Sequence, residues 1–400
     1  MPALPGEWTV WRKGLFCILR RCNLLVTQRR DTDTGNPRAD ARIEDIERFD
    51  VPQSANLGSR ERRVSLKLKV IAAGLTVMLA GAAGAQKITA AGATFPNPIY
   101  NRWFTEYAQA HPGVEINYQS LGSGAGIKQT SEGTVDFGAS DMPVADDVVS
   151  AAKVKFIQIP TVLGAVVPVY NVPGVSKPLN FSGDVIADIY LGNIKRWNDG
   201  RIAKDNPGVS LPDKQIVPVY RSEGSGTTFI FTDYLSKVSP EWSSKVGKNS
   251  AVKWPAGVGA KGSEGVSGMV RQTPGSFGYV ELIYAIQNKM EYGTVKNAAG
   301  KFLLGTPDGV TAAAAASAKT MQTDYRVSIT NAAGPASYPI SSFTYLLIPK
   351  PFADPAKGAA VRDFLTWMLE HGEGEASAMG YAPLPAQVQT MVKKTITTVK

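Results

Sequence analysis

The chain has 400 residues, of which 44% are hydrophobic and 19% charged, and its formal net charge at pH 7 is +9. Its Lys and Arg residues are scattered and form no basic stripe, which argues against a nucleic-acid-binding protein. The sequence contains only two histidines and two cysteines, and none has the spacing of metal ligands, so we predict no transition-metal site.

The N-terminal part of the chain differs from the rest. The basic segment 60–69 is followed by the apolar run 70–81 and by Ala83-Gly84-Ala85, a pattern typical of a secretory signal peptide cleaved after Ala85. The apolar run is shorter than the roughly 20 residues that a membrane-spanning helix needs. We therefore assign residues 64–85 to a signal peptide and expect export to a Gram-negative periplasm.

Residues 1–63 precede this predicted signal peptide, although such a peptide belongs at an N-terminus. We interpret 1–63 as a doubtful leader, with translation beginning near Val64; a genuine long leader is the alternative. The only cysteines, Cys17 and Cys22, lie in this leader, so the exported chain has no disulfide and no cysteine for lipid attachment. Residues 1–85 hold 14 basic and 9 acidic side chains, which leaves the exported part with a net charge of +4.

Polar residues follow three consecutive predicted strands. The first strand begins at Ile88 and leads through a glycine turn to Thr94 and Phe95, where a helix begins; for Thr94 a plain helix cap is the alternative. The second strand, 114–118, leads into Gly122-Ser-Gly-Ala-Gly, which places Ser123 at a second helix start. This glycine spacing fits neither a Walker A loop nor a dinucleotide fingerprint.

The third strand begins at Val135 and ends at Asp141. In open α/β sheets ligands collect at the carboxyl edge of the strands, so Asp141 is a candidate binding residue. A cap on the following helix is the alternative for this acid.

Two long β-rich runs divide the remaining chain. The run 156–170 is apolar, β-branched and longer than an ordinary strand, and 338–349 is a second β-rich run. We predict that both cross between two lobes. The expected organisation is a first lobe from 86–165 and 338–400, and a second lobe from 166–337.

Within the second lobe, the stretch 220–231 combines the features of an anion site. The strand 216–220 feeds Arg221 and the turn Gly224-Ser-Gly-Thr, and a helix follows over 228–235. Unpaired backbone N–H groups at a helix start and the bidentate fork of arginine both bind anions. Glu223 is predicted to orient Arg221, with a solvent-exposed loop acid as the alternative.

Other elements give weaker indications. We interpret the glycine-rich loop 257–265 as close backbone packing in preference to a ligand contact, and we predict a strand over 276–281. Helices are expected over 182–191, 312–318 and 356–370 and at the C-terminus. Ser225 lacks the Gly-x-Ser-x-Gly elbow and a histidine base, which argues against serine hydrolysis.

Five segments in order resemble the periplasmic phosphate-binding proteins of high-affinity phosphate ABC transporters. They begin at Ala91-Gly-Ala-Thr-Phe, Gly122-Ser-Gly-Ala-Gly, Val135-Asp-Phe-Gly, Tyr190-Leu-Gly-Asn and Arg221-Ser-Glu-Gly, and the likeness covers nearly all of 86–400. The resemblance implies an α/β, two-lobed periplasmic-binding-protein fold (type II-like) that closes on its ligand in a cleft. It implies phosphate contacts from both lobes: Thr94, Phe95, Ser123 and Asp141, and Arg221, Ser225, Gly226 and Thr227.

The resemblance also implies the partners. They are inorganic phosphate and the inner-membrane permease subunits with their cytoplasmic ATPase; the protein itself is expected to be a monomer, without a cofactor and not an enzyme. Glu223 departs from relatives that carry Asp two residues after the arginine, which affects the expected affinity.

Asp141 distinguishes between candidate anions. Phosphate keeps a proton near neutral pH and can donate it to a buried carboxylate, whereas sulfate has none to give, so an unpaired acceptor would disfavour sulfate. Two rivals stay open. One is the same scaffold tuned to another oxyanion such as sulfate or molybdate. The other is a secreted phosphate-ester hydrolase with Ser225 or Thr227 as the nucleophile.

Overall fold

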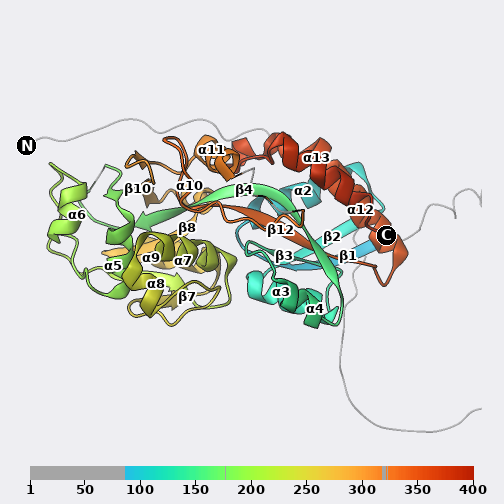
Figure 1. Cartoon of the computed structure of the whole chain (residues 1–400), viewed down its shortest axis with the longest axis horizontal. Helices are drawn as coiled ribbons and strands as arrows, with labels where there is room; N and C mark the ends of the chain where they lie inside the picture. The colour runs from blue at the N-terminus through green and yellow to red at the C-terminus, as the bar shows by residue number, and fades with distance from the viewer. Residues whose placement is uncertain (1–85, 176, 318–320, 322) are drawn as a thin grey trace, which may run out of the picture. The chain divides into compact units, whose positions relative to one another are not determined.

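The structure is a computed structural model that describes residues 86–175, 177–317, 321 and 323–400 (Figure 1). The predicted leader, 1–63, and the predicted signal peptide, 64–85, lie outside the described residues. Within the described part of the chain, every helix is too short or too polar to span a bilayer.

A nine-stranded mixed sheet forms the framework. Its strands lie in the order β2-β1-β3-β12-β4-β8-β6-β7, and β9 pairs with β4 at the side of this path. β1, β2 and β3 run parallel to one another, as do β6, β7 and β8, whereas β12 and β4 pair antiparallel with their neighbours. The strand bounds are β1 Gln86–Gly92, β2 Val114–Ser120, β3 Phe137–Ser140, β4 Phe156–Tyr170, β6 Val217–Arg221, β7 Val258–Ala260, β8 Ser276–Glu281, β9 Glu291–Tyr292 and β12 Ser341–Pro349.

β4 and β12 connect the two halves of the sheet. β4 pairs with β12 from Phe156 to Ala165 and with β8 from Val166 to Tyr170, so one strand serves both halves. Figure 1 shows β4 and β12 side by side, with β1, β2 and β3 towards one end and β8 towards the other. We call the half with β1, β2 and β3 the first lobe and the half with β6, β7 and β8 the second lobe. The pairing of β12 with β4 shifts register between Thr344 and Tyr345, as at a β-bulge.

The helices follow from glycine, proline and capping signals. α2 carries a proline in its first turn and buries Ile99, Trp103 and Tyr107 on one face. α3 ends at Gly133 and α5 at Gly192, both in the left-handed conformation that favours glycine. The helix bounds are α2 Asn97–Ala110, α3 Ser123–Glu132, α4 Asp146–Ala151, α5 Gly183–Leu191, α6 Gly200–Asp205, α7 Gly226–Val238, α8 Pro240–Lys245, α9 Gly262–Gln272, α10 Leu282–Gln287, α11 Pro307–Ser317, α12 Pro355–Glu370 and α13 Ala386–Ile396.

Smaller elements complete the fold. A three-stranded sheet has the order β11-β10-β5, and two short 3-10 helices follow α12. Their bounds are β5 Asn180–Phe181, β10 Thr294–Lys296, β11 Phe302–Leu303, η3 Gly372–Glu375 and η4 Ser377–Met379. Large aromatic side chains such as Trp103, Trp197 and Trp242 are fully buried in the core, and the described residues contain no cysteine that could form a disulfide.

The structure agrees with most predicted elements and changes the bounds of others. α11 begins at Pro307 and not at the predicted residue 312. β8 occupies the predicted range 276–281, and α5 ends at the predicted glycine. α7 begins at Gly226, two residues before the predicted start, so Gly226 and Thr227 belong to its first turn. The segment 257–265 is not one loop, because β7 lies within it and α9 begins at Gly262.

Candidate functional site

The predicted binding residues meet between the two lobes. β1, β2 and β3 deliver four of them at their carboxyl ends, and β6 delivers the other four, as expected for parallel strands. All are buried, and the seven with side chains are at most 3% exposed: Thr94, Phe95, Ser123, Asp141, Arg221, Ser225 and Thr227. Gly226 is buried as well.

Thr94 and Phe95 lie between β1 and α2. The Thr94 hydroxyl is 2.9 Å from the Ser263 hydroxyl of the second lobe. α2 has Pro96 as its cap and no side-chain capping bond, so Thr94 does not cap this helix. The Phe95 ring packs closely on Gly164 of β4, and its carbonyl accepts from the Tyr381 hydroxyl at 2.7 Å. The Phe95 side chain therefore packs in the core, and the backbone is the part of this residue that could contact a ligand.

Asp141 is held by two hydroxyls. Ser123 donates to Asp141 Oδ2 at 3.3 Å and accepts from the Asp141 backbone N–H at 3.1 Å. Thr344 of β12 donates to Oδ1 at 2.7 Å. The next helix, α4, is capped by Ala145, so Asp141 is not a helix cap. Its carboxyl has a fixed orientation at the boundary between the lobes.

Arg221 ends β6 and is 3% exposed. Glu223 accepts hydrogen bonds from Arg221 Nε, at 2.8 Å, and from Nη2. Glu223 also accepts from the Gly262 backbone N–H, so it lies in a hydrogen-bonded site and is not a solvated loop acid. The other guanidinium nitrogen, Nη1, donates to Thr227 Oγ1 at 3.2 Å and to Ser263 Oγ at 3.1 Å.

Ser225, Gly226 and Thr227 form the start of α7. Ser225 caps the helix, because its hydroxyl accepts from the Thr228 N–H at 3.2 Å, and its own N–H donates to the Ser250 carbonyl at 2.9 Å. No hydrogen bond among the described residues uses the Ser225 hydroxyl proton as donor. The N–H groups of Gly226 and Thr227 lie in the first turn, where an α-helix offers them no acceptor. The start of α7 therefore presents donors to an anion.

The two lobes are in direct contact around these residues. The Gly124 N–H of the first lobe donates to the Gly224 carbonyl of the second at 2.9 Å. Gly226 lies so close to the first lobe that a β-carbon at this position would be 2.4 Å from Ser123 Oγ and 2.6 Å from Asp141 Cβ. On another side, the Tyr284 hydroxyl donates to the Thr94 carbonyl at 2.8 Å. The structure thus has the site closed.

Two further polar residues of the second lobe belong to this cluster. Ser263 lies in the first turn of α9 and contacts Thr94, Arg221 and Glu281. Glu281 ends β8 and is 1% exposed. The segment 257–265, which the sequence indicates mainly as close backbone packing, therefore also contributes Ser263 to this cluster. Glu281 is an acid at the end of an apolar strand, the same pattern that identified Asp141 as a candidate site residue. This pattern could have identified Glu281 from the sequence.

Burial governs the charges of the two carboxyl groups. It raises the pKa of Asp141 to about 8, with repulsion from Glu281 as the next cause, while Thr344, Arg221 and Ser123 oppose the shift. Burial also raises the pKa of Glu281, against the attraction of Arg221 and the hydrogen bonds from Thr227 and Ser263. The site therefore places one cation, Arg221, among three acidic residues: Glu223, Asp141 and Glu281. This arrangement favours a ligand that brings its own proton.

The arrangement offers many hydrogen-bond donors and few groups for proton transfer. The chain has two histidines, and both lie at helix C-termini: His111 after α2 and His371 after α12. Within the described residues, no three His, Cys, Asp or Glu side chains are grouped so as to hold a metal ion. The chemistry that this geometry supports is the enclosure of a small oxyanion.

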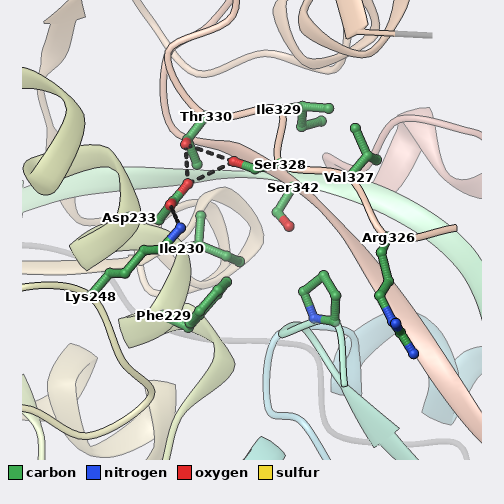
Figure 2. A pocket seen from close by; sticks show the side chains of 11 residues that line it. Phe229, Ile230, Asp233, Lys248, Arg326, Val327, Ser328, Ile329, Thr330 and Ser342 are labelled. Atoms are coloured by element: carbon green, nitrogen blue, oxygen red, sulfur yellow. Dashed lines mark hydrogen bonds and ion pairs between the residues drawn. The ribbon is translucent and has the colours of Figure 1, made fainter. Parts of the chain in front are cut away.

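A separate pocket of about 260 Å³ lies along α7, beyond the site. Figure 2 shows Asp233 of α7 directed at Lys248, Ser328 and Thr330. Lys248 Nζ lies 2.8 Å from Asp233 Oδ1, and Lys237 and the two hydroxyls contact Oδ2. This cluster ties α7 to the segment that precedes β12, and so fixes the helix whose first turn enters the site.

Comparison with known proteins identifies related chains. A family model described as a PBP superfamily domain matches residues 79–371. A protein named phosphate-binding protein PstS from Xylella fastidiosa (strain Temecula1) is 44% identical over 308 residues, which cover 77% of this chain and 84% of the relative. A protein of the same name from Pasteurella multocida (strain Pm70) is 44% identical, with 76% and 88% covered.

The fold has solved counterparts. A structure titled as a high-affinity periplasmic phosphate-binding protein bound with phosphate superposes with a TM-score of 0.61 at 24% identity, covering 77% of this chain and 93% of the other. At this identity the likeness concerns the two-lobed α/β fold.

Proposed function

This chain belongs to the phosphate-binding protein PstS family within the PBP superfamily, and from that premise we propose that it binds inorganic phosphate between its two lobes. The single observation that carries the proposal is the convergence of Arg221, the first turn of α7 and the hydroxyl of Thr94 on one buried place. These groups supply charge and directed donors for a tetrahedral anion.

The residues that we propose as phosphate contacts are those that the sequence predicts. Thr94, Phe95, Ser123 and Asp141 would contact phosphate from the first lobe, and Arg221, Ser225, Gly226 and Thr227 from the second, with Glu223 orienting Arg221. Asp141 would accept the proton that phosphate retains. We place the lobe boundaries at 86–165, 166–337 and 338–400; the change of β4's pairing partner between Ala165 and Val166 supports the first of them.

We further propose that the protein acts in the periplasm as a monomer. It would deliver phosphate to the permease of an ABC importer driven by a cytoplasmic ATPase, and it would catalyse no reaction itself. The predicted signal peptide and the names of the relatives support this assignment. The absence of a histidine near Ser225 and Thr227 supports binding over phosphate-ester hydrolysis.

Calorimetric titration of residues 86–400 with phosphate and with sulfate, after dialysis to remove bound ligand, tests the proposal. We expect tight binding of phosphate and much weaker binding of sulfate at pH 8 and above. Equal affinities there would contradict the role of Asp141 and favour a scaffold tuned to another oxyanion.

The variant Arg221→Ala tests the position of the site. Hydrogen bonds to a charged group contribute about 1.5–3 kcal/mol each, so losing the fork should weaken phosphate binding by roughly 100-fold or more. Arg196→Ala is the matched control, because Arg196 is exposed and paired with Asp213 on the surface of the second lobe. Unchanged affinity in Arg221→Ala, with circular dichroism like that of the parent, would show that the anion binds elsewhere.

A further inference from the structure

Glu281 lies at the end of a hydrogen-bond relay that connects both lobes. Thr227 donates its hydroxyl proton to Glu281 Oε1, and Ser263 donates to Oε2 at 2.7 Å. Because the Ser263 proton is committed to Glu281, the contact between Thr94 and Ser263 leaves Thr94 as the donor. Three hydroxyls thus direct their protons, in one or two steps, towards a single buried carboxylate.

Arg221 reinforces the same arrangement. Its Nη1 donates to the oxygens of Thr227 and Ser263, so the cation faces Glu281 through the two hydroxyls. In the closed site of this structure, Glu281 receives the donors that the proposed function assigns to phosphate. A hydroxyl has one proton, and so Thr227 cannot donate to Glu281 and to a bound anion at the same time.

We propose that Glu281 is a positioning residue that holds the hydroxyl proton of Thr227 in the phosphate-free protein and releases it when phosphate binds. It does so by taking one proton from solvent, after which the carboxylic acid donates its new O–H to the Thr227 oxygen. Thr227 then turns its own proton to phosphate. This inference rests on the proposed function and adds a proton-coupled step to it.

The charges around Glu281 give the reason for the proton uptake. Arg221 faces it from β6 with Glu223 as its partner, and Asp141 faces it from the first lobe. The phenol groups of Tyr284, in α10, and Tyr381, after η4, also lie within its electrostatic reach, with Glu264 of α9 beside Tyr284. A phosphate dianion added to Arg221 and to the carboxylates of Glu223 and Glu281 leaves an excess of negative charge, which a proton on Glu281 reduces.

The test compares Glu281→Gln with the parent protein by titrating phosphate between pH 6 and 9. The ionisation of phosphate affects both proteins equally, so it cancels in the ratio of their dissociation constants. Both proteins carry Asp141→Asn in this titration, because Glu281 raises the pKa of Asp141 and its titration would otherwise contribute to the ratio. We expect the ratio of parent to variant to rise with pH, by up to tenfold per pH unit for one linked proton. Glu373→Gln is the matched control, because Glu373 is also a buried glutamate, 6% exposed, but lies outside the site.

A pH-independent ratio for Glu281→Gln would overturn the proposal, as would a ratio for Glu373→Gln that rises equally. If the parent protein itself fails to bind phosphate, the proposed function fails instead, so the two failures are distinct. A second measurement needs no variant. In parent protein labelled with ¹³C at glutamate carboxyl carbons, which leaves Asp141 silent, one resonance should move from the carboxylate to the carboxylic-acid position when phosphate is added. If no glutamate resonance does so, the proposal is wrong.

Discussion

Gly226→Ala would separate closure of the lobes from the chemistry of the ligands. Gly226 begins α7 in the second lobe, and its nearest neighbours across the gap are Ser123 and Asp141 of the first. The backbone of residue 226 is not in the left-handed region, so alanine fits the helix itself and keeps the N–H donor. The nearest atoms that the added methyl group would meet belong to the opposite lobe.

The contact distances determine the size of the effect. The new β-carbon would be 2.4 Å from Ser123 Oγ, whereas ordinary contacts measure 3.4–4 Å, so the lobes must separate by about 1 Å. Overpacking of this kind typically costs about 1–3 kcal/mol, which corresponds to a loss of roughly 5- to 150-fold in phosphate affinity. The melting temperature without ligand should fall little, because the methyl group can be accommodated by opening.

Calorimetry with phosphate and small-angle scattering with and without ligand measure both consequences. Gly268→Ala is the matched control, since Gly268 lies inside α9 of the same lobe and a β-carbon there meets no atom within 4 Å. We expect parental affinity in the control and a more open particle in Gly226→Ala. Parental affinity in Gly226→Ala would refute the view that phosphate is held in the closed arrangement of this structure.

Two further predictions concern acids with shifted pKa values. Below pH 8 the Asp141 carboxyl is neutral and can donate to sulfate, whereas above pH 8 the carboxylate can only accept a hydrogen bond. The preference for phosphate over sulfate should therefore grow as the pH rises through 8. In Asp141→Asn, titrated with both anions, this preference should not change with pH. Although burial opposes the charge of Asp233, hydrogen bonds from Lys248, Ser328 and Thr330 lower its pKa to about 2. Its stabilisation is therefore present above the unfolded pKa near 4 and lost as the pH falls towards 2. Asp233→Asn should lower the free energy of unfolding in urea by about 2 kcal/mol at pH 7, and a deficit that persists unchanged at pH 3 would exclude the electrostatic explanation.

The sequence predicted much of the framework, because glycines, prolines and apolar runs determine where strands and helices begin and end. Glycines before helix starts placed Ser123 and the segment from Arg221 to Thr227 at strand ends, and the unusual length of 156–170 indicated a strand shared by two lobes. Chain topology then brings together strand ends far apart in sequence. The agreement concerns geometry, and the role of each residue towards phosphate stays a prediction.

The contacts that the sequence did not predict depend on residues distant in the chain. Thr344 lies in the β-rich run 338–349, and only the pairing of β12 beside β3 brings its hydroxyl to Asp141. Ser263 looked like part of a packing loop because the start of α9 has no side-chain cap to mark it. Glu281 had a detectable pattern, but its partners come from two other elements, so its connection to Arg221 required the structure.

The irregularity in β12 has a mechanical consequence. The two halves of the molecule share one hydrogen-bonded ladder, so opening must bend paired strands, and a bulge is the most compliant point of such a ladder. The register shift directly follows Thr344, whose hydroxyl donates a hydrogen bond to Asp141. Bending of β12 at this point therefore moves Thr344 and, through its hydrogen bond, the Asp141 carboxyl. We expect the orientation of the Asp141 carboxyl to follow the angle between the lobes, without a separate rearrangement of its own.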